Sequence, residues 1–189
     1  MCGRYNIDFE ANKELKKVLN ELNRKYPGNH IKKGEVFPTN EAAIFIKHEN
    51  EMAPELSVWG YPQYTGKGVI INARAETAME KKTFRESVIS RRCIIPTNGF
   101  YEWDKDKNKF LFERLDAKTM YLAGLYNLYQ GVNRFVILTT AANESMKSVH
   151  HRMPVVLEED QLEDWLYSGE KANIILHVVP ESLKKVQTN

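Results

Sequence analysis

The sequence lacks three features that would each define a class of protein: it has few cysteines, no long hydrophobic run and no excess of one charge sign. Its two cysteines allow at most one disulfide, and no apolar signal segment stands near the N-terminus, so we expect a protein of the reducing cytoplasm. A membrane span needs about 20 apolar residues in succession, so we expect no membrane contact. The 27 basic and 25 acidic residues nearly cancel, which excludes a histone-like protein and leaves nucleic-acid binding to a local basic patch.

What is present is enough apolar material for one folded core. Hydrophobic residues make up 42% of the 189 positions, which suffices for a single buried core and excludes wholesale disorder. The sequence shows no repeat, no low-complexity tract and no linker. We therefore expect one domain, residues 1–189, that acts as a monomer.

One amphipathic helix is predicted over residues 8–26. Four apolar residues recur at the three- and four-residue spacing of one helix face, with lysines and glutamates opposite: Leu15, Val18, Leu19 and Leu22. The Pro-Gly-Asn sequence at residues 27–29 ends it.

The rest of the chain is dominated by short segments typical of strands. Runs rich in β-branched and aromatic residues, separated by Gly, Asn, Asp or Lys, predict strands at 42–47, 55–59, 69–71, 92–96, 110–115, 120–125, 134–140 and 174–179. Helices are predicted at 82–90, 144–149 and 160–167, the last with Asp160 as its N-cap. Strands outnumber helices and do not alternate with them, which favours an α+β fold over a doubly wound sheet.

Cys2 is the first candidate for chemistry. Removal of Met1, by an aminopeptidase or by the protein itself, would leave an N-terminal aminothiol whose amine has a pKa of about 7.7–8.0 and whose thiol has one near 8.5. Such an amine forms a Schiff base with an aldehyde, and the thiol can then close a thiazolidine ring. A Met-Cys start by itself is more often incidental. Cys93, inside a predicted strand, is expected to be a buried and inert thiol.

Polar side chains within two strand-like segments are further candidates. Asn72 ends an apolar strand, and Arg74, two residues on, projects to the same face; alone, the pair fits an ordinary strand that leads into a loop. Glu102 stands between Tyr101 and Trp103, where a carboxyl group would be desolvated and suited to acid–base work. A half-exposed strand glutamate fits that pattern equally well.

The adjacent residues His150 and His151 are the last candidates. On an extended segment they would point to opposite faces, so they would not bind one metal ion together. The two cysteines lie too far apart for a zinc motif. Either one histidine faces a site as a proton donor, or both are solvated in a loop. We expect no metal and no cofactor.

Four ordered motifs together resemble the SOS response-associated peptidase (SRAP) family. They are Met-Cys-Gly-Arg-Tyr at 1–5, Asn-Ala-Arg-Ala-Glu-Thr at 72–77, Gly-Phe-Tyr-Glu-Trp at 99–103 and His-His-Arg-Met-Pro at 150–154. Trp-Gly at 59–60 and the segment 138–143 are also similar to family segments. The resemblance spans nearly the whole chain.

This resemblance implies a fold, a substrate and a set of site residues. The fold is a single α+β domain around a curved, barrel-like, mainly antiparallel sheet with a few flanking helices. The activity is the trapping of abasic sites in single-stranded DNA through a thiazolidine with the processed Cys2, and the protein would be nucleoid-associated when bound. Carried over to the matching positions, the partners of Cys2 are Asn72, Glu102 and His150, and the residues that approach DNA are Arg4, Arg74, Thr139 and Arg152.

The chemistry of these residues suits such a reaction. An abasic sugar is mostly a closed hemiacetal that must open before an amine can attack it. Glu102 could move the protons for opening and imine formation, while Asn72 orients the amine. Arg74 and Arg152 could bind flanking phosphates. We assign His150 to reversal of the link.

Residues 61–66 depart from the family pattern, because some relatives carry an aromatic wedge and a longer loop there. Two other functions also stay open. Glutamine amidotransferases with an N-terminal nucleophile begin Met-Cys-Gly as well, and there Cys2 would attack an amide as thiolate. A non-covalent single-strand-binding module would use tyrosines and tryptophans as stacking platforms.

Overall fold

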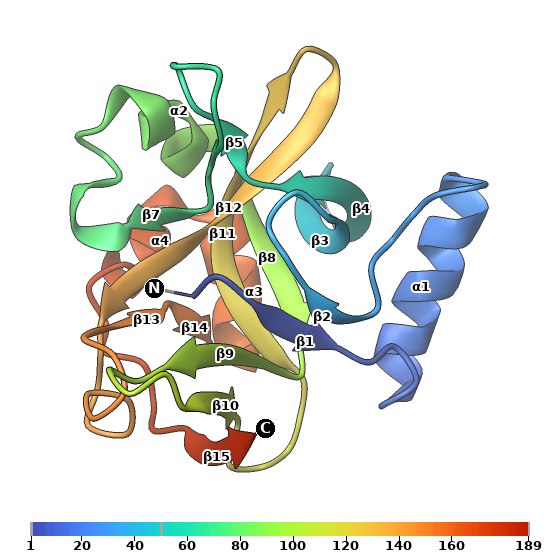
Figure 1. Ribbon diagram of the computed structural model, residues 1–189. Helices are drawn as coiled ribbons and strands as arrows, with labels where there is room; N and C mark the ends of the chain where they lie inside the picture. Colours follow the sequence, from blue (N-terminus) through green and yellow to red (C-terminus); the bar gives the residue numbers. More distant parts are fainter. Residues whose placement is uncertain (1, 50, 189) are drawn as a thin grey trace.

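The centre of the fold is a closed barrel of five strands (Figure 1). The computed structural model describes residues 2–49 and 51–188. In order around the barrel the strands are β12 (Val132–Ala141), β4 (Glu51–Trp59), β3 (Glu41–His48), β8 (Arg92–Thr97) and β11 (Met120–Tyr129). Pairing between β11 and β12 closes the ring, and only the β12–β4 contact within it is parallel. The predicted α+β fold with a barrel-like, mainly antiparallel sheet is confirmed.

Three short strands extend this barrel. β7 (Asn72–Arg74) runs parallel to β12, and β13 (Arg152–Pro154) pairs antiparallel with the same part of β12. β14 (Val156–Leu157) pairs with β11. The end of β12 therefore brings together the two segments that carry Asn72 and Arg152.

A second, five-stranded sheet lies across one end of the barrel (Figure 1). Its strands, in order, are β15 (Lys184–Thr188), β10 (Lys109–Glu113), β9 (Gly99–Trp103), β1 (Tyr5–Ile7) and β2 (Gly34–Val36). The chain passes from β8 of the barrel into β9 through Asn98 alone. This direct passage places Glu102, on β9, close to the barrel. A separate two-stranded hairpin consists of β5 (Tyr61–Pro62) and β6 (Val69–Ile70).

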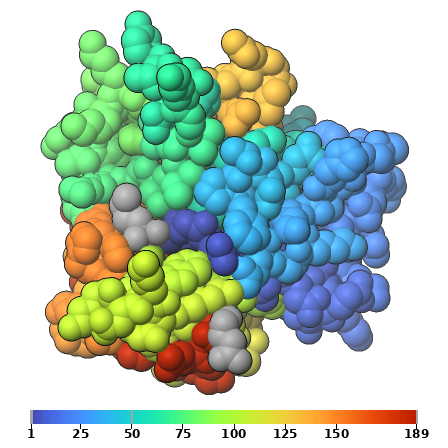
Figure 2. Space-filling view, viewed as in Figure 1, coloured from blue at the N-terminus to red at the C-terminus, as the bar shows by residue number. Residues whose placement is uncertain are grey.

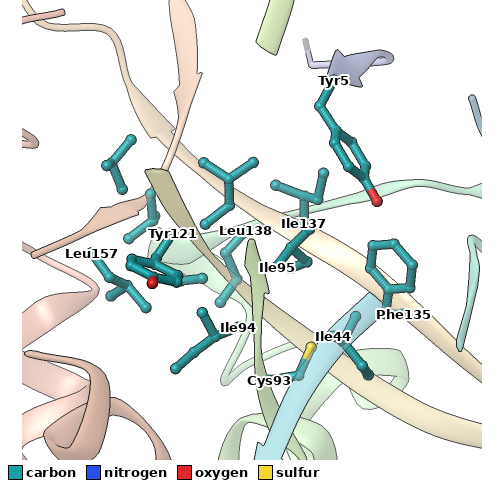
Figure 3. Packing of buried hydrophobic residues seen from close by; sticks show 14 of the residues in the cluster. Tyr5, Ile44, Cys93, Ile94, Ile95, Tyr121, Phe135, Ile137, Leu138 and Leu157 are labelled. Carbon is teal, nitrogen blue, oxygen red and sulfur yellow. The ribbon is translucent and has the colours of Figure 1, made fainter. Parts of the chain in front are cut away.

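The core is one continuous cluster of buried apolar side chains. Consecutive residues of the barrel strands are fully buried, such as Ile94 and Ile95 on β8 and Ile137 and Leu138 on β12 (Figure 3). Both faces of these strands are therefore covered, which explains why the sequence reads as unbroken apolar runs. On β11, a Cβ atom at Gly124 would lie only 2.9 Å from the Val136 carbonyl oxygen of the neighbouring strand β12. This close contact between the two strands requires glycine at position 124.

Helices cover the outside of the barrel. α1 (Lys13–Lys25) packs against β3 and β4, α2 (Lys82–Ser90) against β8 and β11, and α3 (Leu162–Tyr167) against β3 and β8. α4 (Gly169–Ile175) lies against α3, and two short 3₁₀ turns are η1 (Ala75–Thr77) and η2 (Glu159–Gln161). The prediction for 82–90 is confirmed to the residue.

Several predicted boundaries were wrong for identifiable local reasons. The first helix begins at Lys13 rather than at residue 8, because the Asn12 side chain accepts a hydrogen bond from the Leu15 amide at 2.9 Å and caps it. Residues 144–149 form turns instead of a helix. Asp160 is no N-cap, because Glu158 forms a capping box with Gln161. The strand predicted at 174–179 is absent, since α4 runs to Ile175 and turns follow it.

Candidate active site

The N-terminal segment lies between the barrel and the second sheet. Figure 1 places it beside β7, β13 and β9, and Figure 2 shows its darkest-blue atoms where segments from distant parts of the chain meet. Cys2 is fully buried, and its carbonyl oxygen accepts a hydrogen bond from Asn72 Nδ2 at 2.9 Å. The thiol Sγ lies 3.7 Å from the Arg4 carbonyl oxygen, to which it donates. The predicted removal of Met1 concerns a residue outside those that the structure describes.

The Cys2 thiol is held in its protonated form. Burial, with a smaller contribution from the negative charge of Glu102, raises the pKa of Cys2 to about 12. Glu102 is 5% exposed and lies on β9, a hundred positions along the chain from Cys2. The electrostatic effect shows that the fold brings the carboxylate close to the thiol.

The backbone of Arg152 fixes the orientation of the His150 ring. His150 Nδ1 lies 2.9 Å from the Arg152 amide nitrogen and 3.2 Å from the Arg152 carbonyl oxygen. Burial lowers the pKa of His150, and the nearby charge of Glu102 opposes that shift. The predicted partners of Cys2 are thus within electrostatic or hydrogen-bonding range of it or of one another.

The two histidines do not point to opposite faces, contrary to the sequence prediction. Their rings stack with centroids 4.4 Å apart and an angle of 24° between the planes. The prediction assumed an extended segment, whereas the backbone bends at His151 after a series of turns. His151 is exposed and covers one side of the His150 ring.

Arg152 is a buried support of this region. Its guanidinium donates to both carboxylate oxygens of Glu76, at 2.6 and 2.9 Å, and to the Thr139 carbonyl oxygen at 2.6 Å. Thr139 has no exposed surface, so direct contact between Thr139 and DNA is excluded in this conformation. Arg152 is only 9% exposed. Both residues tie β12 and β13 to η1, beside β7.

The other two predicted DNA-contacting residues reach the surface. Arg74 ends β7 and is exposed, while Arg4 is about one-third exposed at 29% of its side chain. The Arg4 guanidinium lies between the rings of Phe37 and Trp103, 4.2 and 4.9 Å from their centroids. Glu35 binds it at 3.1 Å.

Sequence reasoning missed the carboxylates that hold these arginines. Glu76 lies within the motif at 72–77 and is four residues from Asn72, so its sequence position offered a signal. Glu35, on β2, offered none, because its partner Arg4, just before β1, is 31 residues away in the sequence.

The described residues contain neither a cluster of metal ligands nor a membrane-spanning helix. Within residues 2–49 and 51–188, no group of three or more His, Cys, Asp or Glu side chains is placed to hold a metal ion. None of the helices in the same residues is long and apolar enough to span a membrane.

Comparison with known proteins identifies the family. The model of the family described as SOS response associated peptidase (SRAP) matches residues 1–188. The chain belongs to this family. An SRAP relative, the abasic site processing protein YoaM of Bacillus subtilis, is 44% identical over 182 residues, covering 88% of this chain and 79% of YoaM.

A more distant relative agrees with this assignment, and a solved structure shares the fold. The abasic site processing protein YedK of Escherichia coli is 26% identical over 188 residues, covering 93% of this SRAP chain and 85% of YedK. A crystal structure of a protein from Bordetella bronchiseptica superposes with a TM-score of 0.77 at 24% identity, covering all of both chains. That likeness concerns the fold alone.

Proposed function

We propose that this SRAP protein captures abasic sites in single-stranded DNA as a covalent adduct of Cys2. The observation that carries the proposal is the convergence of Cys2, Asn72, Glu102 and His150, which come from four separate segments of the chain. Two relatives are named abasic site processing proteins. An aldehyde is the reactive form of an abasic sugar, and an N-terminal aminothiol is a specific trap for aldehydes.

The capture balances as a condensation. Once Met1 is removed, the amine of Cys2 attacks the C1′ aldehyde of the opened sugar and forms a carbinolamine. Loss of water gives an imine, and addition of the thiol across the C=N bond gives a thiazolidine. One aldehyde and one aminothiol thus yield one thiazolidine and one water, with no oxidant or reductant.

The neighbouring side chains supply positioning and proton transfer. Asn72 holds the Cys2 carbonyl and thereby orients the terminal amine. Glu102 moves the protons of ring opening and of dehydration, and it takes the thiol proton when the sulfur adds. His150 serves the return of the sugar to its closed form.

The phosphates of the strand are bound on either side of Cys2. Arg74 and Arg4 are the exposed cations next to the site. Arg152 and Thr139 support the site from below the surface and do not bind phosphate themselves. The guanidinium of Arg152 is hydrogen-bonded to Glu76 and to the Thr139 hydroxyl. A few such contacts suffice for a local groove, so the net charge of +2 is no obstacle.

The burial of Cys2 and the negative charge of Glu102 near it disfavour the amidohydrolase alternative. A nucleophilic cysteine of that class works as a thiolate, and such thiolates have lowered pKa values in electropositive surroundings. The surroundings of Cys2 raise its pKa, and Glu102 adds negative charge.

The test is incubation with a single-stranded oligonucleotide that holds one abasic site, followed by denaturing electrophoresis. We expect a heat-stable adduct that Cys2→Ala abolishes and that Cys93→Ala retains, since Cys93 is a buried core thiol. An undiminished adduct from Cys2→Ala contradicts the proposal. Binding without an adduct would identify a non-covalent module, and release of ammonia from glutamine would identify an amidohydrolase.

A further inference from the structure

Arg4, two residues after Cys2, and Lys109 of β10 share one carboxylate, that of Glu35. Glu35 Oε2 lies 3.1 Å from Arg4 Nη1, and Glu35 Oε1 lies 2.6 Å from Lys109 Nζ. All three side chains are partly exposed, at 29%, 32% and 17% for Arg4, Glu35 and Lys109. The hydrogen bond from Lys109 lowers the pKa of Glu35, so this carboxylate is ionised at neutral pH.

Strand register puts this cluster on one face of the second sheet. Asn6 pairs with Glu35, and Trp103 pairs with Lys109. The Tyr101 amide donates to the Arg4 carbonyl at 2.8 Å. Because side chains alternate along strands, Arg4, Glu35 and Lys109 lie on the face opposite the buried Phe100 and Phe112.

Aromatic rings hold both cations in place. Arg4 lies between Phe37 and Trp103, and Lys109 Nζ lies 4.2 Å from the centre of the Tyr101 ring. Such cation–π contacts fix the positions of the charges without consuming their N–H donors. Glu35 engages one of the five guanidinium donors of Arg4 and one of the three donors of Lys109.

The carboxylate thus bridges two cations as two phosphate oxygens would. Arg4, Lys109 and Glu35 together carry one net positive charge, which one phosphodiester neutralises. We propose that Arg4 and Lys109 form a phosphodiester subsite beside Cys2, and that Glu35 occupies it until a DNA phosphate displaces it. The inference rests on the proposed function and adds Lys109 as a DNA-binding residue and Glu35 as an internal competitor.

The competition predicts a gain of affinity when the carboxylate is neutralised. In fluorescence anisotropy with an intact oligothymidylate at low salt, Glu35→Gln should bind up to about fivefold more tightly, the range of a partly exposed ion pair. Glu55→Gln is the matched control, because Glu55 pairs with Lys25 of α1 at 2.7 Å and its replacement changes the net charge equally. Equal affinities of Glu35→Gln and Glu55→Gln overturn the inference.

Lys109 provides a second, independent variant. Lys109→Ala should weaken binding and flatten the log–log salt dependence by about 0.7, the value for one phosphate of a single strand. The gain from Glu35→Gln should shrink when Lys109→Ala is added. Unchanged affinity and slope in Lys109→Ala overturn the subsite even if Glu35→Gln does not fold.

A kinetic measurement separates this inference from the proposed function. With an abasic oligonucleotide, Glu35→Gln should lower the DNA concentration for half-maximal adduct formation and leave the maximal rate unchanged. A changed maximal rate at unchanged affinity would place Glu35 in the chemistry and overturn the subsite. If the affinity pattern holds and no variant forms an adduct, the subsite stands and covalent capture fails.

Discussion

At the scale of single residues, Glu102 acts on two groups of the candidate site. Its charge raises the pKa of the Cys2 thiol and opposes the lowering of the His150 pKa by burial. One carboxylate thus influences the trapping group and the group that we assign to release. Glu102 can influence both groups because it lies on β9 of the second sheet, where that sheet meets the barrel.

Replacement of the carboxyl group tests its role as a proton carrier. Glu102→Gln should slow adduct formation by about 10²–10⁴, the usual contribution of general acid–base catalysis. The affinity for single-stranded DNA should change little, because a carboxylate does not bind phosphate. Single-turnover rates and anisotropy on the same protein measure both quantities. Equal losses in rate and affinity would instead assign Glu102 to the structure.

His150 should control how the adduct reverses. His150→Ala should accumulate an adduct that exchanges slowly onto a competing oligonucleotide. Because burial lowers the pKa of His150 below its ordinary value, the neutral form predominates at pH 7, and reversal that depends on it should decline as the pH falls. Exchange measured from pH 5 to 8 checks both points.

The stacked neighbour supplies the control for that measurement. His151→Phe keeps a ring against His150 and should exchange at the parent rate. The assignment fails if His151→Phe is the slow exchanger, or if His150→Ala reverses as fast as the parent protein.

At the scale of elements, Arg92 joins two helices at the start of β8. Its guanidinium donates to the carbonyls of Val88 and Ile89 at the end of α2, at 2.6 and 2.8 Å. It also donates to the carbonyls of Trp165 and Leu166 at the end of α3. One cation therefore satisfies terminal carbonyls of both helices, and its charge is favourable at their negative ends.

Loss of these hydrogen bonds should cost stability without touching the chemistry. Arg92→Met keeps the apolar stem but leaves buried carbonyls unsatisfied, which should cost about 2–4 kcal/mol and lower the Tm by about 5–15 °C. The exposed Arg85 of α2 offers a control, since Arg85→Met should change the Tm little. Thermal unfolding followed by circular dichroism measures the difference. A Tm of Arg92→Met close to that of Arg85→Met would contradict the capping role.

At the scale of the whole molecule, the net charge of +2 means that the proposed binding of DNA would depend on a few local cations. The family resemblance indicated four DNA-contacting positions, three arginines and one threonine, and the fold separates them into an exposed pair and a buried pair. Arg74 and Arg4 reach the surface, while Arg152 and Thr139 are buried under it. The exposed pair can bind phosphates directly, and the buried pair supports β7 and β13.

This division predicts different effects of two arginine replacements. Arg74→Ala should flatten the log–log salt dependence of single-strand binding by about 0.7 and leave the Tm nearly unchanged. Arg152→Ala should lower the Tm, because it leaves Glu76 and the Thr139 carbonyl without their donor. Salt titrations and thermal unfolding of both variants measure the contrast. The division is wrong if Arg152→Ala alone flattens the slope.

Local physical chemistry made part of this protein readable from the sequence alone. The helix at 82–90 and the barrel strands depend on residues close together in the chain, so spacing and composition were sufficient. The order of the four motifs was enough to indicate the family. Boundaries that depend on a single capping side chain, such as Asn12, could not be read from periodicity.

Contacts between distant segments were decided only by the tertiary structure. Pairing of β7 and β13 with β12 buries Arg152 against Glu76, and a bend at His151 stacks two rings that an extended chain would separate. The register of β1, β2 and β10 places Glu35 between two cations. Burial and charge at these sites are sums over neighbours that lie far away in the sequence. A sequence therefore determines which groups are available, and the packing of strands determines which of them meet.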